Sequence, residues 1–264
     1  MSDHSKEELL TGGNVSKVYR LGNTVRREMT ENSRRVHALL KHLEAKNIEF
    51  TPRFLGIDEQ GREILSFIEG EAGNYPLKDY MWSSEALEKI AKMQRRYHDA
   101  VKDFEVGEYW KPVVQTSDQA EVICHNDFAV YNMIFADGIP VGLIDFDVAG
   151  PGPVLWDIAY TLYTCVPLSR FYLVETGEKC FYQSSSDAKR IKERINLFFE
   201  AYGIQGSKDC LDMVLFRLED LCKTIESHAN EGVAAFQKMK AEGHIEHYVH
   251  DINFIRKHRH EWEE

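Results

Sequence analysis

A histidine, an aspartate and an asparagine stand close together in the segment CHNDFAVYNMIF, among apolar residues that otherwise suit burial. His125 and Asp127 are separated by one residue, and Asn132 lies five residues after the aspartate. A second aspartate, Asp145, follows the apolar run VGLI. An aspartate that accepts a proton from a hydroxyl, beside an amide oxygen and a carboxylate that hold Mg²⁺, is the set of groups that phosphoryl transfer from ATP requires.

The residues between Asn132 and Asp145 predict a β-hairpin that brings these two groups together. Asp137 and Gly138 are typical of a two-residue turn with positive φ. If the turn has two residues, counting back along both strands places Asn132 opposite Leu143, on the same face as Asp145. Diagonal neighbours of this kind lie roughly 7–8 Å apart at Cα. At that separation an amide oxygen and a carboxylate can hold one hard cation between them.

Each of these residues also has an ordinary structural explanation when it is taken alone. An Asp in a loop often caps a helix or forms a turn, and a His before it is often a buried hydrogen-bonding residue. The run IDFD can simply end a strand. The combination favours chemistry, because the pattern H-x-D-x-x-x-x-N followed by Asp-Phe has the residue types and the order of a phosphoryl-transfer site.

The composition limits the classes of function. The chain has 264 residues, 43% of them hydrophobic, which is enough for one large domain or two packed lobes. A net charge of −11 argues against a protein that binds nucleic acid or anionic membranes without specificity. Acidic residues are about twice as numerous as basic ones in residues 71–150, whereas residues 1–70 are balanced. This excess suits a cationic substrate or a solubilising surface.

Cysteine usage and hydropathy bear on the compartment. The five cysteines are scattered without a CxxC pair, which favours reduced thiols in a cytoplasmic protein. The N-terminus MSDHSKEELL does not read as a signal peptide, and no run of about 18 apolar residues occurs. We therefore expect a soluble protein with no membrane partner.

The elements that must position the site fall into two groups. The first seventy residues predict strands and one helix, with a hairpin turn at Gly22-Asn23, a second turn around residues 59–61, and Ser33 as the helix N-cap. From residue 71 the pattern is mainly helical, and Ser83 or Ser84 is expected to cap the first of these helices. The predicted helices cover residues 33–47, 83–101, 185–203 and 210–229.

The segment HNDFAVYNMIF…VGLIDFDVAGPGPVLWDIAY resembles the aminoglycoside phosphotransferase and choline kinase-like family, small-molecule relatives of the protein kinases. The resemblance implies an α+β, two-lobed protein kinase-like fold. Residues 1–70 would form a nucleotide-binding N-lobe, a small antiparallel sheet with one helix, and residues 71–264 a larger, mainly helical catalytic and substrate-binding C-lobe. The implied activity is transfer of the γ-phosphoryl group of MgATP to a hydroxyl of a small molecule, with Mg²⁺ as cofactor.

The resemblance also implies roles for single residues. Asp127 would be the catalytic base, His125 would brace its loop, and Asn132 and Asp145 would be the magnesium ligands. Asp147 would touch a second metal or the substrate, or would only stabilise its loop.

Asp157 would sit in the first turn of a helix and stabilise the catalytic loop. Its role is therefore expected to be structural.

The nucleotide contacts are implied by weaker patterns. Gly13 and Asn14 lie where the family folds a hairpin over the phosphates. The usual phosphate-binding lysine is replaced by Arg26 or Arg27, and aligning the strand favours Arg26, although both arginines can also face solvent.

Two further contacts are expected in the N-lobe, one with the adenine and one between the helix and the phosphate-binding arginine. The backbone of Ser66 to Ile68 would meet the adenine edge. The family's glutamate on the inner face of the helix is missing, and His37 either takes its place as a neutral hydrogen-bonding partner or lies on the surface.

The phosphoryl acceptor is defined only by class. Carboxylates on the C-terminal helices could bind ammonium groups, so the acceptor is expected to be an aminoglycoside or another cationic amino alcohol or sugar, with a neutral sugar or an amino-acid derivative as alternatives. The candidate carboxylates are Asp147, Glu200, Asp212, Glu219 and Glu226.

A different class of function stays open: a catalytically weak or inactive kinase-like nucleotide-binding regulator. A metal hydrolase is disfavoured, because no second histidine or carboxylate follows at ligand spacing near His125 and Asp127. The choice between ATP and GTP and the oligomeric state are not determined by the sequence.

Overall fold

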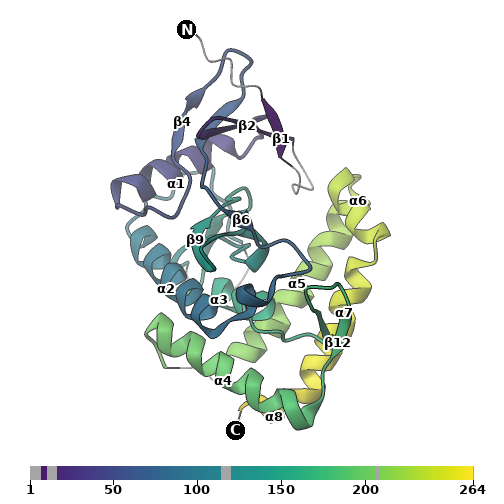
Figure 1. Ribbon diagram of the computed structural model, residues 1–264. Helices are drawn as coiled ribbons and strands as arrows, with labels where there is room; N and C mark the ends of the chain where they lie inside the picture. Colours follow the sequence, from purple (N-terminus) through teal and green to yellow (C-terminus); the bar gives the residue numbers. More distant parts are fainter. Residues whose placement is uncertain (1–6, 11–16, 114–119, 206–208, 264) are drawn as a thin grey trace.

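Figure 1 shows the computed structural model of the chain, which describes residues 7–10, 17–113, 120–205 and 209–263. The N-lobe contains a five-stranded antiparallel sheet with the strand order β1-β2-β3-β5-β4. Its strands are β1 (Glu8–Leu10), β2 (Val18–Leu21), β3 (Thr24–Arg27), β4 (Phe54–Ile57) and β5 (Glu63–Ser66). The predicted turn at residues 22–23 is confirmed, because Leu21 pairs with Thr24 across it.

One helix, α1 (Ser33–Ala45), lies beside this sheet and contacts β4. Its apolar residues recur at helical spacing and are buried, as the sequence predicts. They are Val36, Leu39, Leu40 and Leu43.

The expected cap of α1 is wrong. Asn32 occupies the N-cap position, and Ser33 is the first helical residue. The Ser33 hydroxyl instead accepts a hydrogen bond from the backbone N–H of Thr30 at 2.9 Å. The turn before the helix uses that hydroxyl, so it is not available to cap the first helical turn.

The C-lobe is mainly helical and carries a few short strands. Its strands are β6 (Glu71–Ala72), β7 (Val122–Cys124), β8 (Met133–Ala136), β9 (Ile139–Leu143), β10 (Gly150–Gly152), β11 (Phe171–Leu173) and β12 (Lys179–Phe181). Its helices are η1 (Asp79–Trp82), α2 (Ser84–Val101), η2 (Val130–Asn132), α3 (Val154–Cys165), α4 (Ser184–Tyr202), α5 (Cys210–Asn230), α6 (Ala234–Ala241), α7 (His244–His258) and α8 (His260–Glu263). The two-lobed α+β fold class is confirmed.

Two of the expected helix ends are found in the structure. Ser83 caps α2 and accepts a hydrogen bond from the N–H of Ala86 at 3.0 Å. Gly203 ends α4 with a φ of 87°, a conformation that glycine adopts without strain.

The β8–β9 hairpin turns at residues 137–138, both with positive φ, as predicted. The predicted register holds only near this turn, because a bulge interrupts the pairing in the middle of the hairpin. Leu143 therefore pairs with Met133, and Asn132 lies opposite Ile144, whose N–H donates to the Asn132 carbonyl at 2.9 Å. The expected pairing of Asn132 with Leu143 is wrong by one residue, since a bulge adds a residue to one strand.

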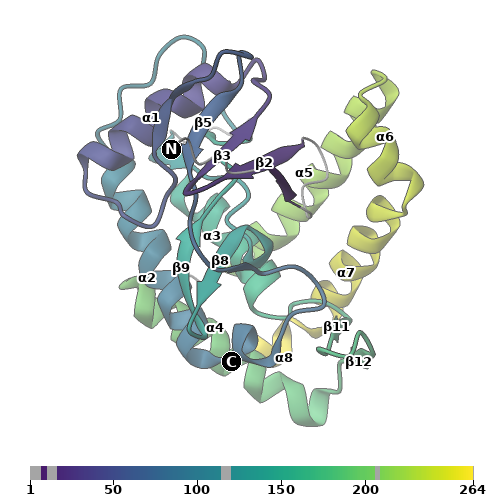
Figure 2. The same ribbon diagram turned by 45° about the horizontal axis from the view of Figure 1, so that its top comes forward.

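The two lobes share one hydrophobic core, which runs from α1 and β5 to α3, α4 and α5. β6 pairs with β8, so the chain that leaves the N-lobe sheet joins the hairpin carrying the candidate site. In Figures 1 and 2, α5, α6 and α7 form an arm on one side of the molecule. The division into units of residues 1–70 and 71–264 stays a prediction.

Among the helices that the structure describes, none has the length and apolar character needed to cross a bilayer.

Candidate active site

Asp127 lies on the loop between β7 and η2, and neighbouring side chains fix its carboxylate. The Tyr131 hydroxyl donates to Oδ1 at 2.6 Å, and the Asn132 amide nitrogen donates to Oδ2 at 2.8 Å. Burial and the nearby Asp127 raise the pKa of the Tyr131 phenol well above its usual value. Tyr131 thus stays protonated and keeps donating to the carboxylate, which leaves the remaining lone pairs of Asp127 for a substrate hydroxyl.

Asn132 ends η2 and is almost completely buried. Its amide nitrogen donates to the carboxylate and to the backbone carbonyl of Asp127. Both of these bonds use the NH₂ group, so the amide oxygen is the atom that can face a cation. The residue can therefore orient the base and ligate a metal with different atoms.

Asp145 follows β9 and has a φ of 67°, in the left-handed region that Asp and Asn tolerate better than most residues. The side chain of Asp145 is about half exposed, but the surrounding protein still desolvates its carboxylate. This desolvation, followed by the neighbouring carboxylate of Asp147, raises the pKa of Asp145 to about 6. Asp127 adds to the rise, and Arg27 only partly offsets it. Crowded carboxylates of this kind are the chemistry of a divalent cation site.

The donor set fits Mg²⁺, which usually takes one or two carboxylates together with substrate phosphates. Asp145 would supply a carboxylate oxygen and Asn132 an amide oxygen. Within the described residues, no group of three or more His, Cys, Asp and Glu side chains could hold a metal ion by itself.

His125 is completely buried. Its Nε2 lies 3.1 Å from the carbonyl oxygen of Ile144, and because a carbonyl only accepts, Nε2 carries the proton. Burial lowers the pKa of His125, so the ring is neutral. The ring also contacts Phe146, with 4.5 Å between centroids. His125 therefore ties the loop of Asp127 to the segment that carries Asp145.

Asp157 lies in the first turn of α3 and is completely buried. It accepts hydrogen bonds from the backbone N–H groups of His125 at 3.1 Å and Asn126 at 2.7 Å. Nε2 of His98 in α2 lies 3.0 Å from Oδ2, the oxygen that also accepts from His125, and Nδ1 of His98 lies 2.7 Å from the Tyr202 hydroxyl. Burial opposes ionisation of Asp157, but the hydrogen bonds to it hold its pKa below the usual value.

Sequence reasoning missed Tyr131 and His98. Tyr131 stands four residues after Asp127, so its place in the loop was the available signal. His98 belongs to a helix 59 residues before Asp157, and nothing in the sequence connects the two.

The structure reverses the expected order of the two arginines of β3. Arg26 donates to the Thr24 hydroxyl at 2.6 Å and lies 3.8 Å from Asp58, within the N-lobe. Arg27 points to the C-lobe instead and donates to both carboxylate oxygens of Asp147, at 2.6 and 3.1 Å. The two arginines diverge because successive strand residues face opposite sides, and this geometry favours Arg27 over Arg26 at the candidate site. The phosphate-binding role of either arginine stays a prediction.

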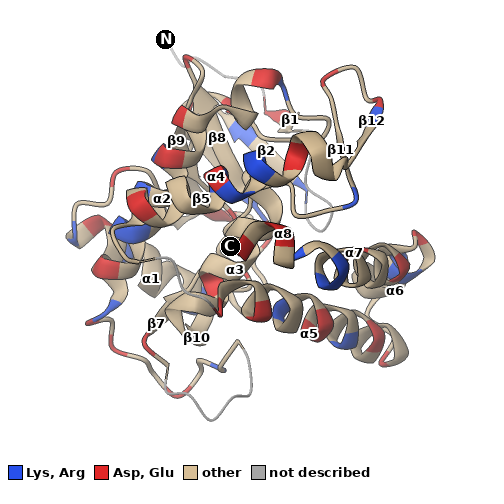
Figure 3. Cartoon of the chain, turned by 90° about the horizontal axis from the view of Figure 1, so that it is seen from below, with Lys and Arg blue, Asp and Glu red and all other residues tan. Residues whose placement is uncertain are grey.

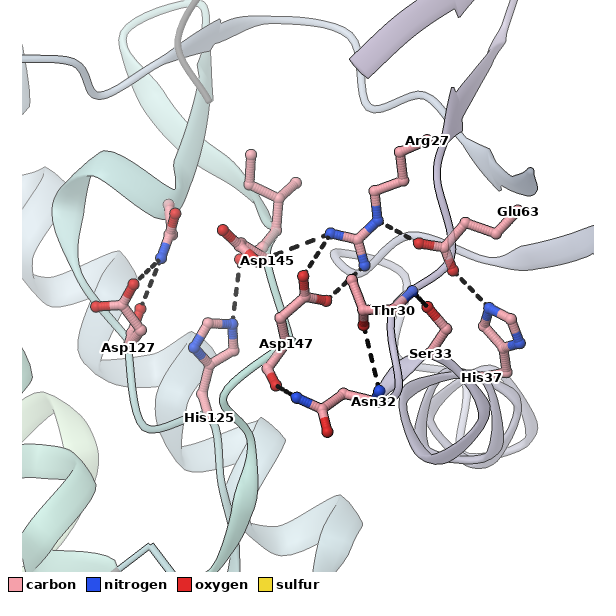
Figure 4. Close-up of polar contacts among 12 residues, drawn as sticks. Arg27, Thr30, Asn32, Ser33, His37, Glu63, His125, Asp127, Asp145 and Asp147 are labelled. Atoms are coloured by element: carbon pink, nitrogen blue, oxygen red, sulfur yellow. Dashed lines mark hydrogen bonds and ion pairs between the residues drawn. The ribbon is translucent and has the colours of Figure 1, made fainter. Parts of the chain in front are cut away.

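Arg27 also approaches the candidate metal ligand, with 3.9 Å between Nη1 and Oδ1 of Asp145 (Figure 4). Asp147 receives further hydrogen bonds at its backbone carbonyl from Asn32 at 3.3 Å and Arg35 at 3.2 Å. Asp147 thus connects both β3 and α1 to the candidate site.

The structure gives His37 a buried position, so the alternative of surface placement is wrong. His37 lies 2.5 Å from Glu63 of β5, and Glu63 also contacts Arg27 (Figure 4). The acidic partner of the arginine therefore comes from the sheet rather than from the helix.

The expected hinge, Ser66 to Ile68, joins the two lobes. The Ser66 N–H donates to the Arg53 carbonyl at 2.9 Å, and a Cβ on Gly142 would lie 2.7 Å from Ile68 Cγ2. The hinge therefore packs directly on β9. Gly13 and Asn14 lie outside the described residues.

The carboxylates expected to bind ammonium groups are largely paired with the chain's own cations. Glu219 contacts Arg256 at 2.5 Å, and Figure 3 shows acidic and basic residues interspersed along α5 and α7. Asp212 pairs in the same way with Arg259, and Glu226 with Lys240. Glu200 is exposed on α4. The roles expected of these residues, like those of the other site residues, stay predictions.

The sequence matches known proteins over part of its length. Residues 76–179 match the phosphotransferase enzyme family, and this stretch contains Asp127, Asn132, Asp145 and Asp157. A 151-residue stretch is 41% identical to the trifolitoxin immunity protein of Rhizobium leguminosarum bv. trifolii. That stretch covers 55% of this chain and 56% of the relative, so the chain spans only about half the length of that protein.

Solved structures match over nearly the whole fold. An amicoumacin kinase in complex with AMP-PNP, Ca²⁺ and Ami superposes with a TM-score of 0.63 at 12% identity, over 95% of this chain and 89% of that chain. Choline kinase from Cryptosporidium parvum Iowa II gives 0.63 at 12% identity, over 97% and 92%. Aminoglycoside phosphotransferase APH(3'')-Id from Streptomyces rimosus, with ADP and streptomycin, gives 0.55 at 17% identity, over 81% and 91%.

These identities are too low to carry more than the fold. Together with the match of residues 76–179 to the phosphotransferase enzyme family, they confirm the predicted resemblance of the fold to aminoglycoside phosphotransferases and choline kinases.

Proposed function

We propose that this protein is a small-molecule kinase that transfers the γ-phosphoryl group of MgATP to a hydroxyl group. The observation that carries the proposal is the fixed carboxylate of Asp127, which accepts from Tyr131 and from Asn132. Asp145 and Asp147 also lie close enough to repel each other, and a bound cation would relieve this repulsion. A purely structural role for Asp127 would not account for these two neighbouring carboxylates.

In the proposed reaction, Asp127 orients the acceptor hydroxyl and takes its proton as the oxygen attacks the γ-phosphorus. The bond between the γ-phosphorus and the β,γ-bridging oxygen breaks, and ADP leaves with that oxygen. Tyr131 and Asn132 hold the carboxylate in one orientation, so no rearrangement is needed when the proton moves. Arg27 would bind the phosphates with the Nη edge that now contacts Asp147. Mg²⁺, held by Asp145 and Asn132, would neutralise charge on the phosphates.

We propose a separate role for each lobe. Residues 1–70 would bind the nucleotide, with the hinge at Ser66 to Ile68 meeting the adenine. Residues 71–264 would carry the base and the acceptor.

We propose an acceptor that carries amino groups, such as an aminoglycoside or an amino alcohol. The names of the structural relatives support this class, since they include aminoglycoside and choline kinases. Glu219 and Asp212 already pair with arginines of the chain, so an ammonium group of the acceptor would have to displace these cations to bind there.

A nucleotide-binding protein without efficient transfer is the second candidate. The relative that is 41% identical over 151 residues is named an immunity protein, and immunity can rest on binding a toxin or on modifying it. The two candidates differ in one respect, because only the kinase needs Asp127 as a base.

The compartment that suits this function is the cytoplasm, where ATP is available. All five cysteines are free thiols, which suits a reducing environment.

The deciding experiment measures ADP release by the purified protein with MgATP and a panel of aminoglycosides, amino alcohols and sugars. Asp127→Asn serves as the blank, because it keeps the size of the side chain and removes its basicity. Acceptor-dependent release that the blank lacks would establish the kinase and its substrate class. Binding of MgATP with equal, acceptor-independent release by both proteins would contradict the kinase and favour the binding protein.

A further inference from the structure

Arg27 stands where the family places a lysine, and it differs from a lysine in having two hydrogen-bonding edges. Its Nε contacts Glu63, while its Nη atoms face Asp147 and Asp145 (Figure 4). Only 12% of the Arg27 side chain is exposed. The guanidinium is thus held on one side by the N-lobe sheet and presents its other side to the candidate metal site.

The contact between Arg27 and Glu63 follows from the strand register. The two residues are direct partners across β3 and β5. Directly opposite residues in an antiparallel pair have neighbouring side chains on the same face of the sheet. No helix residue is needed to bring a carboxylate to this arginine.

Glu63 is completely buried, and a buried carboxylate is costly unless it is fully paired. Its Oε1 accepts from Arg27, and its Oε2 accepts from His37 Nε2 at 2.5 Å. His37 is itself fixed by stacking on Phe54, with 3.7 Å between ring centroids. Both carboxylate oxygens are therefore engaged, and Glu63 cannot turn away from the arginine.

The charges around Arg27 reinforce this arrangement. Burial alone would lower the pKa of Arg27, but the carboxylates of Asp147 and Glu63 raise it above the usual value. When the nucleotide phosphates bind, they have to replace Asp147, because the phosphates and the Asp147 carboxylate would use the same Nη atoms of Arg27. The contact with Glu63 uses Nε and can persist.

We propose that Glu63, held by His37, is the positioning residue that aims Arg27 at the nucleotide phosphates, in place of the helix carboxylate that this chain lacks. The proposal rests on the proposed nucleotide binding of the same site. An arginine suits this arrangement, since its planar guanidinium offers Nε to Glu63 and its Nη atoms to a phosphate in one fixed geometry, whereas the donors of an ammonium group share a single nitrogen.

The first test measures the dissociation constant of a non-hydrolysable ATP analogue with Mg²⁺ by calorimetry. Glu63→Gln should weaken binding at least tenfold. Arg27→Lys should weaken binding nearly as much as Arg27→Gln does. In the Arg27→Gln background, Glu63→Gln should change the constant less than twofold, because its effect passes through the arginine. Asp58→Asn is the control, since it removes a carboxylate that pairs with Arg62 at 2.8 Å and lies 3.8 Å from Arg26, the neighbour of Arg27 in β3. Its binding should stay within twofold of the wild type.

Unchanged binding in Glu63→Gln, or an equal loss in both backgrounds, would overturn the positioning role. Full binding by Arg27→Lys would overturn the argument from two edges. Failure of the wild-type protein to bind the analogue would instead contradict the proposed function.

A second test needs no nucleotide. Urea midpoints are compared for Glu63→Gln, Asp147→Asn and the double variant. If Glu63 aims Arg27 at Asp147, the shift of the double variant will be smaller than the sum of the single shifts. Additive shifts would overturn the positioning role whatever the nucleotide result.

Discussion

The charge of Asp145 is expected to lower the free energy of unfolding, and Asp145→Asn tests this directly. The pKa of Asp145 is raised from 3.8 to about 6. A shift of about two units corresponds to a ceiling of ~3 kcal/mol, at 1.36 kcal/mol per unit. The side chain is 52% exposed, so solvent screening reduces the expected cost to about 1 kcal/mol.

The substitution is well matched to the site. Asn has nearly the same shape as Asp and adopts positive φ readily, so the φ of 67° adds no new strain. Removing the charge relieves repulsion with Asp147 and Asp127, while it loses the 3.9 Å contact with Arg27 and weakens the hydrogen bond from the backbone of Asp147. We therefore expect Asp145→Asn to unfold about 2–4 °C higher than the wild type at pH 7.5 without metal.

The sign of the pH dependence follows from the raised pKa. Below the unfolded pKa of about 4, Asp145 is protonated in both states and costs nothing. Between about pH 4 and 6 the unfolded state ionises first, which destabilises the folded wild type, and above pH 6 the full cost is present. The difference in melting temperature between variant and wild type should therefore grow over this window and then level off.

Mg²⁺ with a non-hydrolysable ATP analogue should reverse the order of stability. At about 100 times its dissociation constant a ligand stabilises a protein by ~2.7 kcal/mol, and Asp145→Asn should lose most of this gain. Thermal melts from pH 4 to 8, with and without the analogue, measure both effects. A variant that melts lower than the wild type without metal, or that is stabilised equally by the analogue, would refute the reasoning.

Three further substitutions test the surroundings of the site. Asp157→Ala leaves buried donors without their acceptor and should cost about 3–5 kcal/mol in urea unfolding, and a cost below 1 kcal/mol would contradict its structural role. Tyr131→Phe removes one hydrogen bond from Asp127 and should lower kcat about tenfold with the KM for ATP unchanged, whereas a KM effect alone would contradict the assignment. Gly142→Ala places a methyl group 2.7 Å from Ile68 and should cost about 1–3 kcal/mol and weaken nucleotide binding, while unchanged stability would show that the hinge yields.

Local chemistry explains where the sequence-based predictions succeed. The turns at residues 22–23 and 137–138 and the end of α4 at Gly203 depend on neighbouring residues and on backbone conformations that few residue types accept. The apolar periodicity of α1 likewise needs no knowledge of the rest of the chain.

The incorrect predictions concern residues whose partners are distant in the sequence, or strands whose hydrogen-bonded pairing is irregular. The bulge in β9 shifts the pairing partner of Leu143 by one residue, and no propensity rule predicts where a bulge occurs. The choice between Arg26 and Arg27 depended on which face of β3 meets the C-lobe, which the tertiary structure decides.

The sequence by itself determined which residues were candidates for the site, because Asp127, Asn132 and Asp145 lie close enough along the chain for one loop and one hairpin to bring them together. The two-lobed fold class followed from the resemblance of this segment to a known family. Only the tertiary structure decided that Glu63 and His37 hold Arg27, and that His98 lies beside Asp157. These contacts join segments far apart in the chain, and their physical basis is the pairing of buried charges, which local sequence patterns do not encode.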